Sequence, residues 1–256
     1  MAGLLYGAST NIGNVRGHNE DSYLAEPSLG LWLVADGMGG HAAGEVASDI
    51  VVRSIGSAIA NGSDLIEAIQ SAHRDVLEAS EDGIGKKGMG STVVAIHVCD
   101  LNYKIAWVGD SRAYLWNGKL KQISKDHSLV QMLVDTGNLS EREAMHHPQK
   151  NIIYQHMGEP DKDELNIGII EGRFCRGQKI LLCSDGLSDE LPKDEIADVL
   201  ARTGSEQEIA DGLISQVLET TANDNVTVIL VAAPDDAPED TGEELSESEK
   251  ITVVGE

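Results

Sequence analysis

The chain contains little cysteine, and its cysteines form no recognisable framework. The three of them, Cys99, Cys175 and Cys183, include no CxxC pair and are odd in number. Neither a zinc site built on paired cysteines nor a set of disulfides is therefore predicted. A chain without a disulfide framework suits a reducing compartment, so we expect a cytoplasmic protein.

Positive charge and long apolar runs are also scarce. The 256 residues include 19 lysines and arginines against 43 aspartates and glutamates, a formal net charge of −24. This charge argues against nucleic acid or an anionic membrane as a partner. No segment approaches the roughly 20 apolar residues that span a bilayer, and the start, MAGLLYGASTNIGNVRG, does not read as a secretory signal. An anionic substrate would need local cations, either basic side chains or metal ions.

Several catalytic motifs are absent or incomplete. There is no GK[ST] phosphate loop, and no cysteine has an arginine six positions later, as in thiolate phosphatases. GIGKKG (residues 83–88) matches the dinucleotide fingerprint, but it follows a helical pattern and precedes a strand, the reverse of what that site requires. GDSRA (residues 109–113) resembles a nucleophile elbow that lacks its second glycine. A serine hydrolase built on Ser111 therefore stays open as an alternative.

The apolar pattern predicts one domain of mixed structure. A chain of this length with 41% hydrophobic residues can bury a full core. Apolar runs predict strands at residues 31–35, 91–98, 103–108, 179–183 and 226–231. Helical periodicity predicts helices over 46–59, 66–76 and 209–218. Capping boxes mark helix starts at Asp64 with Glu67, Ser140 with Glu143, and Ser205 with Glu208. Because this order is no regular βαβ alternation, we expect antiparallel sheets covered by helices.

The composition changes near the C-terminus. After the apolar run 226–233, the sequence reads PDDAPEDTGEELSESEKITVVGE, with nine acidic residues and one lysine. A segment so rich in one charge and so poor in apolar residues is predicted to stay disordered. We therefore expect a catalytic domain of residues 1–233 followed by an acidic tail of residues 234–256.

Four aspartates stand at predicted strand ends. LWLVAD, KIAWVGD and KILLCSD end at Asp36, Asp110 and Asp185, and Asp224 comes just ahead of the last strand. A single Asp-Gly at a strand end is fully explained by a turn. The ends of four strands from one core can converge on one rim, however, and carboxylates crowded together need a cation to neutralise them.

The ligand types favour Mg²⁺ or Mn²⁺. The candidates offer only oxygen, with no histidine or cysteine at metal-ligand spacing, and the spacing of an EF-hand loop is absent. Gly37, beside Asp36, would let a backbone carbonyl approach the metal. Two such ions about 4 Å apart would activate a water and hold the oxygens of a phosphoryl group.

Six motifs, taken in order, resemble one enzyme family. They are RGHNEDSY (16–23), VADGMGGHAAGEVAS (34–48), GMGSTVV (88–94), VGDSRAY (108–114), CSDGLSDEL (183–191) and NDNVTVILV (223–231). The series resembles the metal-dependent protein phosphatases of type 2C in their bacterial form, over roughly residues 4–232.

The resemblance implies an α+β fold, a central β-sandwich of two antiparallel sheets with helices on both outer faces in a four-layer αββα arrangement. It implies hydrolysis of phosphoserine and phosphothreonine in proteins at a binuclear Mn²⁺ or Mg²⁺ centre. The expected protein is a monomer that opposes a serine/threonine kinase and binds neither nucleic acid nor membrane. A catalytically silent binding module is the alternative; silent relatives usually lose metal-site aspartates, and all four are present here.

The same resemblance implies metal ligands residue by residue. Asp36 would bridge two ions, and Gly37 would offer its carbonyl oxygen. Asp185 and Asp224 would complete the ligands of the first ion. Asp110 would help to hold a third, weaker ion.

Further roles and two departures concern the catalytic groups. Arg16 would bind the substrate phosphate, which suits guanidinium geometry, and Glu20 and Asp21 would orient the attacking water. Animal members often carry a histidine, the favoured general acid, where this chain has Met38. His41 is the candidate for that role here, and a cap on the following helix is the equal alternative. Bacterial relatives often read Ile-Thr-Arg after an HPxxN element, whereas this chain reads HPQKNIIYQHMG, a change expected to alter a mobile flap and substrate choice.

Overall fold

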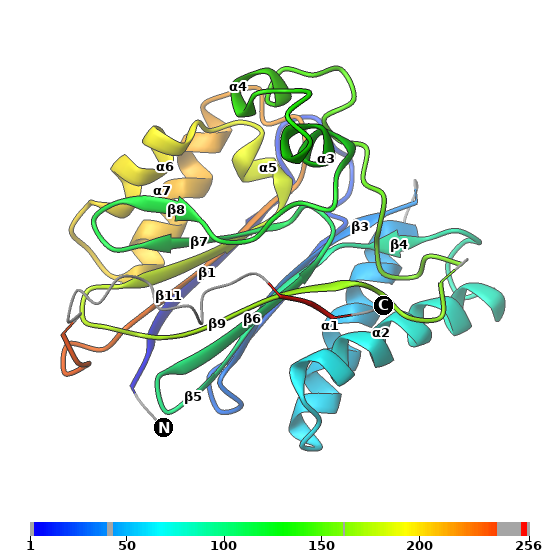
Figure 1. Ribbon diagram of the computed structural model, residues 1–256, viewed down its shortest axis with the longest axis horizontal. Coiled ribbons are helices and arrows are strands. Elements are labelled where there is room, and N and C mark those ends of the chain that lie inside the picture. The colour runs from blue at the N-terminus through cyan, green and yellow to red at the C-terminus, as the bar shows by residue number, and fades with distance from the viewer. Residues whose placement is uncertain (1–2, 40–42, 161, 240–251, 255–256) are drawn as a thin grey trace.

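Two antiparallel β-sheets lie face to face, with helices covering both outer faces (Figure 1). The computed structural model describes residues 3–39, 43–160, 162–239 and 252–254. His41, the candidate general acid, lies outside the described residues. Among those that are described, no helix has the length and apolarity needed to cross a membrane. The expected α+β sandwich is confirmed.

The two sheets are built entirely from antiparallel pairs. The first has the strand order β1 (Leu5–Asn11), β11 (Val226–Ala232), β10 (Lys179–Cys183), β7 (Arg112–Trp116) and β8 (Leu120–Gln122). The second has the order β12 (Thr252–Val254), β9 (Ile167–Arg173), β6 (Asn102–Val108), β5 (Val93–Cys99), β3 (Leu31–Met38) and β2 (Asp21–Glu26), and β4 (Gly90–Ser91) pairs with β3.

Three apolar layers fill the spaces between the four structural layers. In β3, Leu31, Leu33 and Ala35 pack towards the helices, while Trp32 and Val34 enter the space between the sheets. This follows because successive side chains on a strand point to opposite faces. A strand covered on both faces must then be apolar at nearly every position. The strands predicted from continuous apolar runs are therefore central ones, and every residue of β11 is buried.

Helices close each outer face. The second sheet is covered by α1 (Ala43–Ala60) and α2 (Leu65–Glu81), and the first by α5 (Asp185–Ser188), α6 (Lys193–Leu200) and α7 (Glu206–Leu218). Two further helices, α3 (Leu129–Asp135) and α4 (Glu141–Ala144), lie at the top of Figure 1 in an excursion between β8 and β9. All three predicted capping boxes are formed, at the starts of α2, α4 and α7.

Several strands escaped prediction for identifiable reasons. The strands β1 and β2 are only partly buried and carry polar residues, and β9 contains two glycines. The predicted strand 91–98 is divided into β4 and β5 by a break at Thr92. These segments lack the continuous apolar run on which the prediction depended.

The segment after β11 continues to contact the domain. Ala237 is buried in the layer between the sheets, and the Arg176 backbone N–H donates to the Pro238 carbonyl at 2.8 Å. The backbone of β12 pairs antiparallel with β9. A domain boundary at residue 233 stays a prediction, and truncation tests it.

Removing residues 240–256 is expected to leave the melting temperature within about 1 °C of the full chain, because an acidic, apolar-poor segment contributes little burial. Removing residues 234–256 also deletes a buried alanine and a backbone hydrogen bond, about 1 kcal/mol, and should lower the melting temperature by about 2–4 °C. Calorimetry of both truncated chains measures this. A drop of several degrees for the shorter deletion would mean that β12 stabilises the edge of the sheet.

Candidate active site

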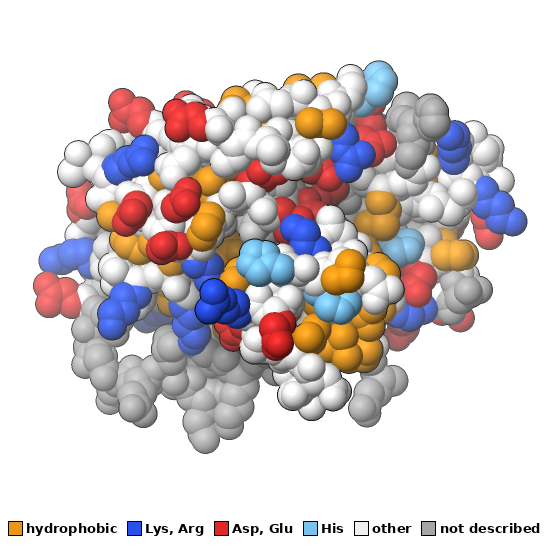
Figure 2. All heavy atoms as spheres, turned by 90° about the horizontal axis from the view of Figure 1, so that it is seen from above, with side chains coloured by type: hydrophobic (Ala, Val, Ile, Leu, Met, Phe, Trp, Pro, Cys, Tyr) orange, Lys and Arg blue, Asp and Glu red, His pale blue; other side chains and the backbone are white. Residues whose placement is uncertain are grey.

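The sheet topology brings four aspartates to one end of the sandwich. The strands β3 and β6 both pair antiparallel with β5, so they run in the same direction and carry Asp36 and Asp110 to the same edge. The strands β10 and β11 pair antiparallel, so Asp185, just after β10, and Asp224, just before β11, also share an edge. Figure 2 shows acidic side chains gathered in the middle of the face seen from above.

Electrostatics confirm that these carboxylates are neighbours. Burial, and then the charges of Asp21, Asp185, Asp110 and Asp224, raise the pKa of Asp36 well above its usual value. Burial and the charge of Asp110 likewise raise the pKa of Asp185. The pKa of Asp110 rises to about 7, mainly by burial. Clustered carboxylates with raised pKa values destabilise one another until protons or cations neutralise them.

Asp21 and Glu20 lie directly against this cluster. Asp21 pairs with Asp36 across β2 and β3, and its buried Oδ2 accepts hydrogen bonds from Ser184 Oγ at 2.8 Å and Thr227 Oγ1 at 2.7 Å. Burial raises the pKa of Asp21 to about 6. The backbone carbonyl of Glu20 accepts from the Gly37 N–H at 3.1 Å. The structure thus places Asp21 within the cluster and the backbone of Glu20 against Gly37.

Gly37 has a packing reason to be glycine. A Cβ at this position would collide with the carbonyl oxygens of Gly44 and Glu20, so a side chain would push the N-terminal end of α1 away from β3. The close approach needs glycine at Gly37 whether or not its carbonyl binds a metal. The sequence analysis anticipated only the role of the Gly37 carbonyl as a metal ligand.

Arg16, the expected phosphate ligand, contacts one of the aspartates. Its exposed guanidinium donates from Nη2 to Asp224 Oδ2 at 2.6 Å, and this hydrogen bond raises the pKa of Arg16. The contact places a cation against a carboxylate predicted to bind metal. It also puts the guanidinium at the rim of the cluster.

Ser111 does not have the surroundings of a hydrolase nucleophile. Its side chain is buried, and its Oγ lies 2.6 Å from Thr92 Oγ1, to which it is hydrogen-bonded. Among the described residues no histidine is hydrogen-bonded to it, whereas an activated serine needs a base within reach. The hydroxyl instead ties the loop after β6 to the segment after β4.

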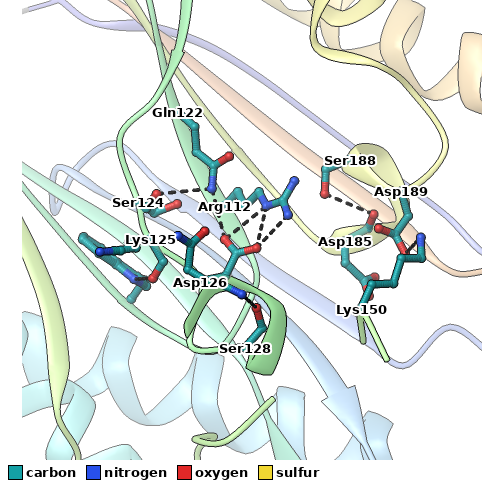
Figure 3. Close-up of polar contacts among 12 residues, drawn as sticks. Arg112, Gln122, Ser124, Lys125, Asp126, Ser128, Lys150, Asp185, Ser188 and Asp189 are labelled. Carbon is teal, nitrogen blue, oxygen red and sulfur yellow. Dashed lines mark hydrogen bonds and ion pairs between the residues drawn. The ribbon is translucent and has the colours of Figure 1, made fainter. Parts of the chain in front are cut away.

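Asp126 is a site-adjacent residue that sequence reasoning missed. It is buried and forms a bidentate pair with Arg112, with Nη2 to Oδ2 at 2.7 Å and Nε to Oδ1 at 3.1 Å (Figure 3). Gln122 also donates to it, at 3.1 Å. After burial, Asp126 is the largest cause of the raised pKa of Asp110. The pair therefore shapes the charge on the Asp110 side of the site.

His127 joins the Asp110 loop to the excursion that carries α3 and α4. Its Nδ1 lies 3.3 Å from the Gly109 N–H and 3.1 Å from Gln155 Nε2. Burial lowers the pKa of His127 to about 4, so at neutral pH the ring is neutral and Nδ1 accepts both hydrogen bonds. Gln155 lies in the HPQKNIIYQHMG segment and is itself buried. These hydrogen bonds therefore anchor the segment beside the site.

The ligand atoms that the site offers are of the type that divalent metal ions bind. Asp21 Oδ1 and Asp185 Oδ1 are buried without a hydrogen-bond partner among the described residues, which leaves acceptor oxygens for a cation. The donors are carboxylates and a carbonyl, the ligands that Mg²⁺ and Mn²⁺ take. In the described part of the chain, no three candidate ligands already stand in ready metal geometry. An ion would therefore draw these carboxylates closer together.

Comparisons with known proteins agree on one relationship. A family model described as protein phosphatase 2C matches residues 15–221. A relative from Listeria welshimeri, the serine/threonine phosphatase stp, is 37% identical over 236 residues, covering 87% of this chain and 93% of that protein. The crystal structure of the Mycobacterium tuberculosis serine/threonine phosphatase PstP/Ppp superposes with a TM-score of 0.82 at 35% identity, covering 93% of this chain and 99% of that one. A structure of the PstP catalytic domain with two manganese ions superposes with a TM-score of 0.79 at 35% identity, covering 91% and 99%.

Proposed function

The chain belongs to the protein phosphatase 2C family, and from this premise we propose that it hydrolyses phosphoserine and phosphothreonine in proteins at a binuclear Mn²⁺ or Mg²⁺ centre. The observation that carries the proposal is the convergence of Asp36, Asp110 and Asp185 at one end of the sandwich, where Asp110 and Asp185 raise the pKa of Asp36 and Asp110 also raises that of Asp185. A cluster that is unfavourable alone is suited to hold cations.

The proposed ligands are Asp36, the carbonyl of Gly37, Asp185 and Asp224, with Asp110 at a third ion. When bound, the ions would acidify a water molecule and neutralise charge on the phosphoryl oxygens. The described geometry supports this set because the four aspartates lie at one rim, and Asp185 keeps an unpartnered carboxylate oxygen.

Arg16 is proposed to bind the phosphate of the substrate. Its guanidinium presents paired N–H donors that match two phosphate oxygens. In this structure the guanidinium donates to Asp224. When substrate binds, Arg16 would donate to the phosphate instead of to the Asp224 carboxylate. That exchange would also leave the Asp224 carboxylate for a metal ion.

Asp21 and Glu20 are proposed to orient the attacking water. The Asp21 Oδ2 atom is held by Ser184 and Thr227, while Oδ1 has no partner in the described structure. A carboxylate fixed through one oxygen can accept a proton or hydrogen bond through the other. His41 is proposed as the acid that protonates the serine or threonine oxygen as it leaves.

We also propose a monomer in the cytoplasm that opposes a serine/threonine kinase and binds neither nucleic acid nor membrane. The three cysteines include no CxxC pair and are odd in number, which suits a reducing compartment. The formal charge of −24 supports the exclusion of polyanionic partners. Residues 1–233 are proposed as the catalytic domain.

Phosphate release from matched peptides tests this function. Peptides that carry phosphoserine, phosphothreonine or phosphotyrosine in one sequence are incubated with protein treated with chelator, then with added Mn²⁺ or Mg²⁺. The proposal expects no release without metal, and release from phosphoserine and phosphothreonine after metal is restored. Full activity in chelator, or release from phosphotyrosine alone, would reject it.

A further inference from the structure

One lysine reaches the acidic cluster from the excursion between β8 and β9. We call residues 127–160 the flap. Lys150 Nζ lies 2.7 Å from Asp189 Oδ2, and Figure 3 shows the Lys150 side chain beside Asp189 and Asp185. Each side chain of the pair is about one-third exposed, at 33% for Lys150 and 30% for Asp189. The contact is therefore at the rim, open to solvent on one side.

The outer part of the flap has little else to hold it. α4 contributes no buried residue, and α3 buries only Val130. Within residues 136–151, all of them described, the Lys150–Asp189 pair is the one hydrogen bond or salt bridge that leaves the flap. A segment with few buried apolar contacts opens readily. Its position over the site should therefore depend strongly on this pair.

The partner in the pair belongs to the helix that begins at a proposed metal ligand. Asp189 is the C-cap of α5, and its backbone N–H donates to the Asp185 carbonyl at 2.8 Å. The Asp189 charge is also one cause of the raised pKa values of Asp110 and Asp185. Lys150 thus neutralises a carboxylate that would otherwise add to the repulsion in the cluster.

The flap also presents apolar side chains to solvent. Met145 is 58% exposed, Tyr154 52% and Ile152 45%. A phosphorylated polypeptide seated in the site would extend past the phosphate and could contact such side chains, whereas a small phosphate ester would not. Holding the flap in place therefore favours the larger substrate selectively.

We propose that Lys150 is a positioning residue that fixes the flap on α5 through Asp189 and thereby sets the affinity for phosphoprotein substrates. The inference rests on the proposed phosphatase function, and it adds a determinant of substrate choice. Lys150 touches neither the phosphate nor the reacting atoms; it acts through the flap.

Steady-state kinetics of Lys150→Ala tests this role. The KM for a phosphoserine peptide should rise by about 3- to 5-fold, the upper part of the range expected for a partly exposed ion pair, with kcat nearly unchanged. Turnover of nitrophenyl phosphate should not change. Lys150→Arg should restore the peptide KM to within about 2-fold, because arginine keeps the charge and the reach.

Three further variants distinguish loss of the Lys150–Asp189 contact from a general loss of stability. Asp189→Asn should reproduce the peptide defect, and the double variant should add nothing, because both changes break the same contact. Lys104→Ala is the matched control, since Lys104 forms a comparably exposed ion pair with Asp64 at 3.0 Å and neither residue lies in the flap. Its peptide KM should stay at the wild-type value.

Two readouts do not depend on activity. Hydrogen exchange of amides 136–151 should be faster in Lys150→Ala while the sheets are unaffected. Mn²⁺ measured by calorimetry should bind Lys150→Ala a few-fold more tightly, because a nearby positive charge is gone. Equal losses for both substrates, additive effects, the same defect in Lys104→Ala, or unchanged flap exchange would each overturn this role of Lys150. If the wild type hydrolyses neither substrate, the proposed function fails, and flap exchange still tests whether Lys150 holds the flap.

Discussion

Replacing Asp36 with asparagine is expected to lower phosphoserine hydrolysis by about 10³-fold, while making the metal-free protein more stable at neutral pH. Activity falls because the carboxylate proposed to bridge two cations is lost, and fixed charge at the reacting centre is worth effects of that size. Stability rises because one of several mutually repelling carboxylates is removed from a buried cluster. A defect of folding alone would not produce this opposite pair of changes.

In the metal-free protein, the buried carboxyls of the cluster should make the free energy of unfolding fall as pH rises. An aspartate in an unfolded chain has a pKa of about 3.9, while burial raises the pKa of Asp21 to about 6 and that of Asp110 to about 7 in the folded protein. The folded state therefore binds more protons between these values. The contribution of these two carboxyls to stability is therefore fully present below about pH 4 and is lost as pH rises to about 7.

Melting curves in chelator across this pH range measure the effect. Asp36→Asn should show a shallower decline than the wild type and a melting temperature at pH 7 higher by about 3 °C. Asp224→Asn should lose activity similarly, whereas Ser111→Ala should stay active. An Asp36→Asn protein that melts lower than wild type in chelator, or that keeps its activity, would contradict the proposed cluster.

Replacing His41 with alanine is expected to slow phosphopeptide hydrolysis by about 10²-fold or more, the lower end for a positioned proton donor. A serine alkoxide is a poor leaving group and needs that proton. A nitrophenolate leaves readily without one, so turnover of nitrophenyl phosphate should drop far less. The two substrates measured side by side, with Mn²⁺ affinity as the control, give the result.

The other outcomes for His41 are distinct. Equal slowing of both substrates would assign His41 to support of the glycine-rich loop or to phosphate binding. No slowing of either would leave it as a helix cap. Mn²⁺ affinity should stay near wild type in every case, because carboxylates hold the ions without the imidazole.

The central part of the site was predictable because its strands are buried on both faces. Such strands read as continuous apolar runs, and an aspartate at the end of each run is visible in the sequence, as at Asp36 and Asp185. The antiparallel topology then brings the ends together. Asp21 was found only through the family resemblance, because β2 is half-buried and gives no apolar run.

Two ion pairs beside the site could not be predicted from local pattern. The Arg112–Asp126 pair and the Lys150–Asp189 pair join segments that meet only after folding. Asp189 follows Asp185 by one helical turn, a spacing that becomes meaningful only once the four residues Asp185–Ser188 are known to form a helix. A helix of one turn containing a glycine has no periodicity from which to infer it.

Titration of chelator-treated protein with Mn²⁺ by calorimetry tests the central claim most directly. The wild type should bind at least two ions per chain, Asp36→Asn should lose the tightest binding, and phosphoserine hydrolysis should return in step with occupancy. Failure of the wild type to bind Mn²⁺ or Mg²⁺, or binding that Asp36→Asn leaves unchanged, would contradict a metal centre built on these aspartates.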